Sequence, residues 1–346
     1  MSIRLGEWKK TKGLLEQVTT TSTAIDRRQT VPLAVLSASH TPLMKDGITT
    51  DEVRRAVKAG FRQLAERAER FNPDLVIQFA PDHFNGFFYD VMPSFCVGAN
   101  ATSIGDWDTG VGSLPVASAE ALKLSEALLN DGIDVAVSYQ MAVDHGFVQI
   151  WEEMFGSFAT YPCIPVFINC AAPPLPTFKR ARLLGEAVGR FAAATGKRVL
   201  FSASGGLSHD PPTPSIVTAP DDVKARLIDG RHPTAEMRQA REERVLAAGV
   251  RALEGHPSIL QVDADWDKRF IEQLQSGNLR DFDALTTAEV REKAGRGGPE
   301  VLAWVAAFAA LAVEGDYKAD LLYYEAIQGW IAGMAMMFAE SKTPRA

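Results

Sequence analysis

Short apolar runs recur along most of the chain and are separated by segments of mixed polarity. The first run, PLAVLSAS, follows Val31, and several of the runs are bounded by proline or asparagine. Apolar runs of this length are typical of strands buried on both faces of a sheet. The sequence predicts five such strands, at about residues 32–39, 75–80, 135–139, 164–169 and 199–204.

Helical spacing separates these predicted strands. Val57, Phe61 and Leu64 recur at intervals of three or four residues after an N-cap at Thr50. Because helices alternate with strands, we predict an α/β fold with a largely parallel central sheet flanked by helices. Ligands of such sheets bind beyond the carboxyl ends of the strands. Further helices are predicted at residues 117–129 and about 179–194.

The last third of the chain has a different pattern. From Ala219 onward the spacing is helical, with a charged segment at residues 237–254 and an apolar helix at 301–313. This pattern predicts a helical C-terminal elaboration. No internal repeat and no linker rich in proline, glycine or serine divides residues 31–340, so we expect a single domain there. Residues 1–30 are expected to be an N-terminal extension with one short helix around Trp8 to Val18.

Composition narrows the class of protein. The chain has 346 residues, 46% of them apolar, with a formal net charge of −7. An acidic chain without a basic run is a poor partner for nucleic acid. No apolar run approaches the roughly 18 residues that cross a bilayer, and the N-terminus lacks the apolar stretch of a signal peptide. The three cysteines fit no disulfide framework, which indicates a soluble, cytoplasmic protein in a reducing compartment.

Four of the six histidines are predicted to follow strands: the first, second, third and last of the five, in chain order. A core histidine bonded to a backbone carbonyl would explain any one of them. Chance would scatter histidines over helices and loops as well, so the four together favour a shared site at one edge of the sheet. They are His40 in SASHTPL, His83 in FAPDHFNG, His145 in MAVDHGF and His209 in SASGGLSHDPP. The other two, His232 and His256, lie next to prolines and are expected to be loop residues.

Two imidazoles and one carboxylate form a ligand set that leaves open positions on iron(II). Histidine spacing alone does not identify the metal, because zinc accepts the same ligand types. Asp82 and Asp144 are candidates for orienting an imidazole through its N–H. Neighbouring side chains on an extended segment point in opposite directions, so neither aspartate is assigned to the histidine that follows it. No GxSxG elbow, GK[ST] loop or GxGxxG turn supports serine catalysis or phosphate binding.

The long segments of the chain resemble the class III extradiol dioxygenases, in order and in spacing. The resemblance extends from about Val31 to about Met337. It implies an enzyme that opens a catechol ring beside its two hydroxyl groups, using Fe(II) and O2. It also implies a small catechol with a 3-carboxyethyl side chain as substrate, and a homo-oligomer. The matching segments are SASHTPL, FAPDHFNGFFYDVMPSFCVG, SYQMAVDHGF, PVFIN, GKRVLFSASGGLSHDPP and WVAAFAA.

The resemblance also assigns roles to residues. It implies that His40, His83 and Glu300 bind the metal, that His145 donates a proton and that His209 accepts one. Glu300 follows a Gly-Gly-Pro turn at the predicted start of a helix, where a carboxylate is favoured whatever its function. Its role as a ligand therefore depends on the resemblance. A zinc hydrolase, or a binding protein that keeps the fold without the chemistry, are the alternatives.

The substrate side chain is less well specified by the sequence. Four aromatic residues after His83 are expected either to be core or to wall a flat substrate. The segment YYEAIQGWIAG departs from the pattern expected for the family and is expected to shape the pocket. The aromatic residues are Phe84, Phe87, Phe88 and Tyr89, and the cations considered for a substrate carboxylate, otherwise surface charges, are Arg180, Arg182, Lys197 and Arg198.

Overall fold

The structure, a computed structural model, describes residues 32–342. The predicted N-terminal extension and its short helix at Trp8 to Val18 lie outside the described residues. Within residues 32–342, no helix combines the length and the apolar character needed to cross a membrane.

The central sheet has eight strands in the described part of the chain. The five predicted strands are confirmed as β1, β2, β6, β8 and β9, each within two residues of its expected bounds. In spatial order the strands are β10 (Tyr317–Ile327), β11 (Ala332–Ser341), β1 (Leu33–Ala38), β9 (Val199–Ser204), β2 (Leu75–Ala80), β8 (Cys163–Ile168), β3 (Phe95–Gly98) and β6 (Ala136–Ser138).

This sheet is mixed rather than largely parallel. Its centre, β1–β9–β2–β8, is parallel as predicted, but β11 runs antiparallel to β1 and to β10, and β3 runs antiparallel to β8. Helices follow Ala219, yet the chain ends in the β10–β11 hairpin. The sequence did not predict β11, because its AGMAMMFA run is rich in alanine and methionine, which favour helices and are not typical of strands.

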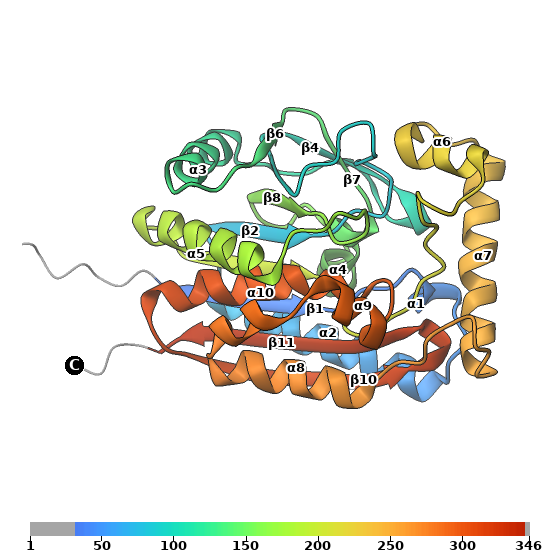
Figure 1. Cartoon of the computed structure of the whole chain (residues 1–346). Helices are drawn as coiled ribbons and strands as arrows, with labels where there is room; N and C mark the ends of the chain where they lie inside the picture. The colour runs from blue at the N-terminus through green and yellow to red at the C-terminus, as the bar shows by residue number, and fades with distance from the viewer. Residues whose placement is uncertain (1–31, 343–346) are drawn as a thin grey trace, which may run out of the picture. The chain divides into compact units, whose positions relative to one another are not determined.

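Helices cover both faces of the central sheet (Figure 1). Helices α5 and α10 pack on one face, with α3 beside α5, whereas α2 and α4 pack on the other. The helices of the described residues are α1 (Leu43–Asp46), α2 (Asp51–Phe71), α3 (Ser118–Asn130), α4 (His145–Phe155), α5 (Phe178–Ala194), α6 (Asp221–Asp229), α7 (Ala235–Leu253), α8 (Ala264–Ser276), α9 (Thr287–Ala294) and α10 (Val301–Leu311).

The two helical layers explain why the central strands read as continuous apolar runs. In β1, Leu33 and Val35 belong to the core cluster under α5 and α10, and Ala34 and Leu36 belong to the cluster under α2 and α4. Alternate side chains of a strand point to opposite faces, so a strand covered on both sides has no polar face. The cores on the two faces therefore fix β1 at the centre of the sheet.

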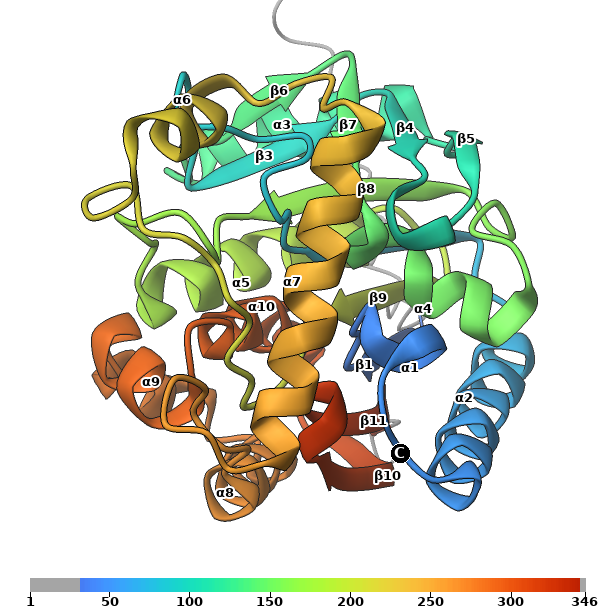
Figure 2. The ribbon, with the colours of Figure 1, turned by 90° about the vertical axis from the view of Figure 1, so that its right-hand side faces the viewer.

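The edge of the sheet beyond β1, β2, β8 and β9 is where the chain turns into loops and short elements. Figure 2 shows α7 crossing in front of these strand ends. A second, three-stranded sheet lies along the chain between β3 and α4, in the order β5 (Val111–Ser113), β4 (Ala101–Ile104) and β7 (Met141–Val143). Strand β7 of this small sheet ends just before His145, the first residue of α4.

Two glycines let α5 approach α10 closely. A Cβ added to Gly185 would lie 2.1 Å from the backbone oxygen of Ala306, and one added to Gly189 would lie 2.2 Å from that of Ala310. Both pairs are four residues apart and form one face on each helix. Helix α10 is buried along its whole length, so it has no room to move away. The position of α10 matters because Glu300 directly precedes it.

We expect Gly185→Ala to destabilise the protein. Replacing glycine by alanine in a helix ordinarily stabilises by roughly 0.5–1 kcal/mol. Here the added methyl group meets backbone atoms, and overpacking of this kind costs about 1–3 kcal/mol. Urea unfolding should show a lower midpoint for this variant, whereas Ala194→Ser, at an exposed position of α5, should change the free energy of unfolding by less than about 0.5 kcal/mol. An unchanged or raised midpoint for Gly185→Ala would contradict the close packing.

Candidate active site

Four histidines and one glutamate from separate segments meet at the loop edge of the sheet. His40 follows β1, His83 follows β2 and His209 follows β9, as the sequence predicts. His145 instead begins α4 and follows β7, a strand of the small sheet, so its link to the predicted third strand is wrong. Glu300 ends the short 3-10 helix Gly298–Glu300 and is the N-cap of α10.

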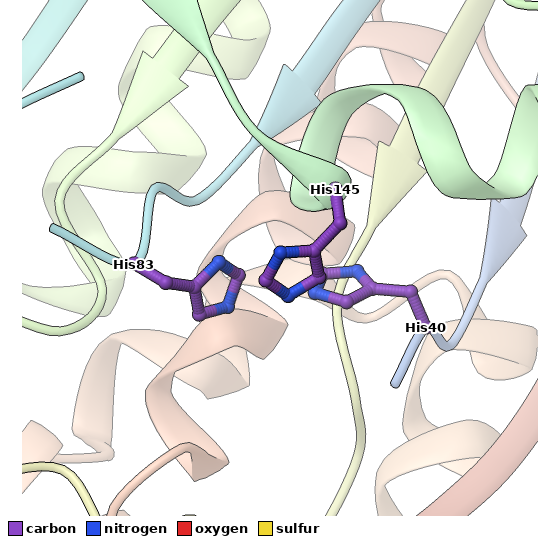
Figure 3. A group of neighbouring side chains, drawn as sticks. All are labelled: His40, His83 and His145. Atoms are coloured by element: carbon purple, nitrogen blue, oxygen red, sulfur yellow. The ribbon is translucent and has the colours of Figure 1, made fainter. Parts of the chain in front are cut away.

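Three of the imidazoles form a compact group (Figure 3). The ring centroids of His83 and His145 are 4.3 Å apart and the rings stack, while His40 lies 5.3 Å from each and meets both edge-on. One ring nitrogen from each of the three lies within 4.8 Å of the others, a spacing that could hold a metal ion. The four histidines separated in sequence therefore include at least three that can act on one ion.

The Glu300 carboxylate joins the histidines. Its Oε1 is 3.2 Å from Nε2 of His83 and 3.1 Å from Nε2 of His209. Its Oε2 accepts a hydrogen bond from the backbone N–H of Gly206 at 3.0 Å and lies 3.8 Å from Nε2 of His40. Glu300 is only 3% exposed, so each of these contacts offsets the cost of burying a charge.

Two of the imidazoles are oriented by aspartates. The Nδ1–H of His83 donates to Oδ2 of Asp144 at 3.0 Å, and the same oxygen accepts from the backbone N–H of His83 at 2.9 Å. Asp106 binds His145 with both of its carboxylate oxygens: Oδ2 lies 2.6 Å from Nδ1, and Oδ1 accepts from the backbone N–H at 2.8 Å. Asp144 thus serves a histidine 61 positions earlier in the chain and not its neighbour, and Asp106 had no signal in the sequence.

The other two imidazoles have neutral partners. Nδ1 of His40 lies 2.8 Å from Oγ of Ser204, at the end of β9, and Nδ1 of His209 lies 3.1 Å from the carbonyl oxygen of Leu207. All four rings therefore use Nδ1 to hold their orientation. This arrangement leaves Nε2 of each ring for chemistry.

Asp82, the second aspartate suggested by the sequence, orients no imidazole ring. Its carboxylate accepts from the backbone N–H groups of Asn85, Gly86 and Phe87, at 3.0, 2.8 and 3.2 Å. These bonds close the turn that carries His83. Burial and the nearby Asp144 carboxylate raise the pKa of Asp82 to about 7.

The pKa values of His40 and His83 shift in opposite directions. Burial lowers the pKa of His40 to about 3, against the opposing effect of Glu300, so this imidazole is neutral at pH 7. Burial would also lower the pKa of His83, but Asp144 and Glu300 outweigh it and raise the pKa well above its usual value. For Glu300, burial would raise the pKa, and His209 and His83 overcome that effect and hold it well below its usual range.

The turn that carries His209 is fixed from both sides. Asp267 on α8, fully buried, accepts from the backbone N–H and the Oγ–H of Ser208, at 2.7 and 2.9 Å. On the other side, Arg296 donates to Asp210 through Nε at 2.6 Å. These supports were not predicted, because each joins segments more than 50 positions apart.

Glycines give the His209 ring its space. A Cβ on Gly206 would lie 2.6 Å from Nδ1 of His209, and a Cβ on Gly297 would lie 2.0 Å from its Nε2. The close approach of the imidazole therefore accounts for glycine at both positions.

A cavity of about 1300 Å³ opens over the histidines. All four candidate histidines line it, as do three of the four aromatic residues named from the sequence, while Glu300 lies beneath. Phe87 also stacks on Phe167 of β8, with centroids 3.8 Å apart. From the C-terminal segment YYEAIQGWIAG, Trp330 and Ile331 reach the cavity wall. The aromatic residues in the wall are Phe84, Phe87 and Phe88.

The cations named from the sequence do not line this cavity. Arg182 binds Asp283 at 2.7 Å, and Lys197 and Arg198 pair with carboxylates elsewhere. The arginines that line the cavity come instead from α6, α7 and the segment between these helices. The charged segment at residues 237–254 signalled this helix, but nothing in the sequence indicated which surface it covers.

Site and sequence together define a ring-opening enzyme of the extradiol dioxygenase class. The chain belongs to the family described as the catalytic LigB subunit of aromatic ring-opening dioxygenase, which it matches over residues 34–335. This membership decides between the alternatives left by the sequence and rejects the zinc hydrolase and the non-catalytic binding protein.

Several relatives share one name, and the match to this chain covers nearly the whole length of each of them. The chain is 47% identical to the 2,3-dihydroxyphenylpropionate/2,3-dihydroxicinnamic acid 1,2-dioxygenase of Photorhabdus laumondii subsp. laumondii, over 89% of this chain and 98% of that protein. The protein of that name from Paraburkholderia phymatum is also 47% identical, over 90% of this chain and 99% of the relative. One from a Rhodococcus species is 46% identical over 89% and 98%.

We expect Gly297→Ala to impair ring opening by displacing the His209 ring. The added Cβ would overlap Nε2, so the imidazole must leave its place above Glu300. Steady-state assays should show a loss of at least about tenfold in kcat, because a misplacement of about 1 Å can cost about 10²-fold. Circular dichroism should show that the variant is folded. Unchanged kcat would contradict the position of His209 beside this glycine.

Proposed function

We propose that this enzyme uses iron(II) and O2 to open the ring of 3-(2,3-dihydroxyphenyl)propionate, with His40, His83 and Glu300 as the metal ligands. The observation that carries this proposal is the approach of the Glu300 carboxylate to Nε2 of His83 at 3.2 Å and of His40 at 3.8 Å. Two imidazoles and one carboxylate leave open positions on iron. The substrate follows from the relatives that carry its name. We assign the chemistry to a single catalytic domain, residues 31–340.

The donor set suits a divalent ion. His40 and His83 each hold Nδ1 in a hydrogen bond and direct Nε2 toward Glu300, which is the arrangement found in metal-ligating histidines. Among residues 32–342, no lysine or arginine lies within ion-pair distance of Glu300, so imidazoles are the groups that compensate its charge. A bound cation would supply that compensation.

A second set of three donors, His40, His83 and His145, has nitrogens within 4.8 Å of one another. We favour Glu300 over His145 as the third ligand because a carboxylate neutralises part of the charge of the ion. The two sets differ in whether removal of His145 releases the metal.

Bound iron(II) would supply adjacent open positions for the catechol oxygens and for O2. The chain supplies proton transfer. His209, whose Nδ1 bonds to a neutral carbonyl oxygen, takes a proton from a catechol hydroxyl at Nε2. His145 donates a proton from Nε2 later in the reaction, and the Asp106 carboxylate, 2.6 Å from its Nδ1, holds the ring in place. Phe84 and Phe87 bound the space for a flat ring.

Anaerobic loading with Fe(II), followed by air and a panel of 3-substituted catechols, tests the function. We expect a yellow ring-opened product together with oxygen uptake, and the highest kcat/KM for 3-(2,3-dihydroxyphenyl)propionate. Zinc-loaded protein is the control and should take up no oxygen, because zinc has no redox chemistry. The absence of product with every catechol would reject the proposal.

The role of His145 predicts that His145→Ala loses turnover and keeps its metal. Loss of a proton-transferring side chain should lower kcat by about 10²- to 10⁴-fold. Metal analysis of the purified variant should still find one iron per chain, whereas a ligand role for His145 predicts that iron is lost. His256→Ala, an exposed histidine outside the cavity, is the matched control and should behave like the wild type. Full turnover by His145→Ala would contradict the assignment.

A further inference from the structure

Five arginines of the described chain line the cavity over the histidines. They come from α6, α7 and the segment between these helices, so they face the candidate metal site from one side. Figure 2 shows α7 standing across the strand ends at which that site lies. The five are Arg226, Arg231, Arg238, Arg241 and Arg244.

Two of these arginines already have carboxylate partners. Arg226 binds Asp222, one turn earlier on α6, at 3.0 Å. Arg231 binds both Asp90 and Asp229, at 2.8 and 2.6 Å. Their charges are compensated within the protein, so they contribute little to the binding of a further anion.

Arg241 has only neutral partners in the described chain. Its Nη2 donates to the backbone oxygen of His83 at 2.6 Å, and its Nη1 donates to Oδ1 of Asn85 at 2.9 Å. A guanidinium has five N–H donors, so three remain. The contact with His83 also places this cation beside a residue assigned to the metal. Arg241 is therefore a partly buried, uncompensated charge at the wall nearest the site.

Arg244 lies one turn further along the same face of α7. Within residues 32–342 it forms no hydrogen bond and no ion pair, and Glu242, which also lines the cavity, pairs with neither arginine. Burial, followed by Arg241 and Arg226, lowers the pKa of Arg244. Arg244 is exposed, and with Arg241 it presents positive charge to the cavity with no carboxylate partner among the described residues, so an anion in the cavity would be attracted by both.

We propose that Arg241, with Arg244 beside it, binds the side-chain carboxylate of the substrate. This inference rests on the proposed function, in which the diol lies at the metal. A ring held there by its two hydroxyl groups directs its 3-substituent along the cavity wall. Arginine matches a carboxylate with paired N–H donors, which fixes the orientation as well as the charge. The pair thus selects catechols with an acidic side chain over neutral ones.

The test compares two substrates that differ only in the charged group. Iron-loaded wild type, Arg241→Gln and Arg244→Gln are assayed with 3-(2,3-dihydroxyphenyl)propionate and with 3-propylcatechol. We expect each variant to lower kcat/KM for the propionate by about 10- to 100-fold, mainly through KM, with little change for 3-propylcatechol. Arg180→Gln, a change outside the cavity, is the control and should leave both values unchanged.

Arg241 also supports the His83 segment, so the Arg241→Gln variant could lose activity through damage to the metal site and not through loss of carboxylate binding. Damage to the metal site would lower activity with both substrates by the same factor and reduce iron content. Arg244→Gln breaks no contact of the described chain and keeps the test decisive. Anaerobic Kd values for both catechols measure binding without turnover. If neither variant changes the ratio of the two kcat/KM values, the carboxylate site is wrong; ring cleavage by the wild type would then still support the proposed function.

Discussion

A buried carboxylate surrounded by imidazoles is the interaction that organises the site. Glu300 is 3% exposed, and its oxygens meet Nε2 atoms of His83 and His209 at 3.2 and 3.1 Å, with His40 at 3.8 Å. Burying an unpaired carboxylate is costly, so the fold must bring these partners to it. The ends of β1, β2 and β9 therefore lie next to the start of α10. The close contact of α10 with α5, through Gly185 and Gly189, fixes where that start lies.

The orientation of the rings depends on partners distant in sequence. Asp144 holds His83, Asp106 holds His145, and Ser204 holds His40. The partners also differ in charge: aspartate carboxylates hold His83 and His145, whereas a hydroxyl holds His40 and a backbone carbonyl holds His209. In the function that we propose, one residue type serves as ligand, acid and base at a single edge of the sheet.

Much of the fold could be predicted from local pattern. Strands such as β1 and β9 are buried on both faces, and continuous apolar runs signal that environment directly. Strand β11 was not predicted because its alanine and methionine residues favour helices in isolation, and burial against β1 and α2 overrides that preference. The sequence also could not predict the direction of the strands near the edges of the sheet, because the hydrophobic pattern is the same for parallel and antiparallel pairing.

For the site, the sequence by itself determined the chemistry available: four histidines after short apolar segments, and a glutamate after a Gly-Gly-Pro turn whose role depended on resemblance. Only the tertiary structure decided which groups face one another. In the structure Asp144 binds His83 and not its neighbour, and Asp106 binds His145. The cations that line the cavity include Arg241 and Arg244, whereas Arg180 and Arg198 lie outside it. The physical reason is that residue type and local spacing fix what a side chain can do, whereas hydrogen bonds between segments far apart in sequence exist only after the chain has folded.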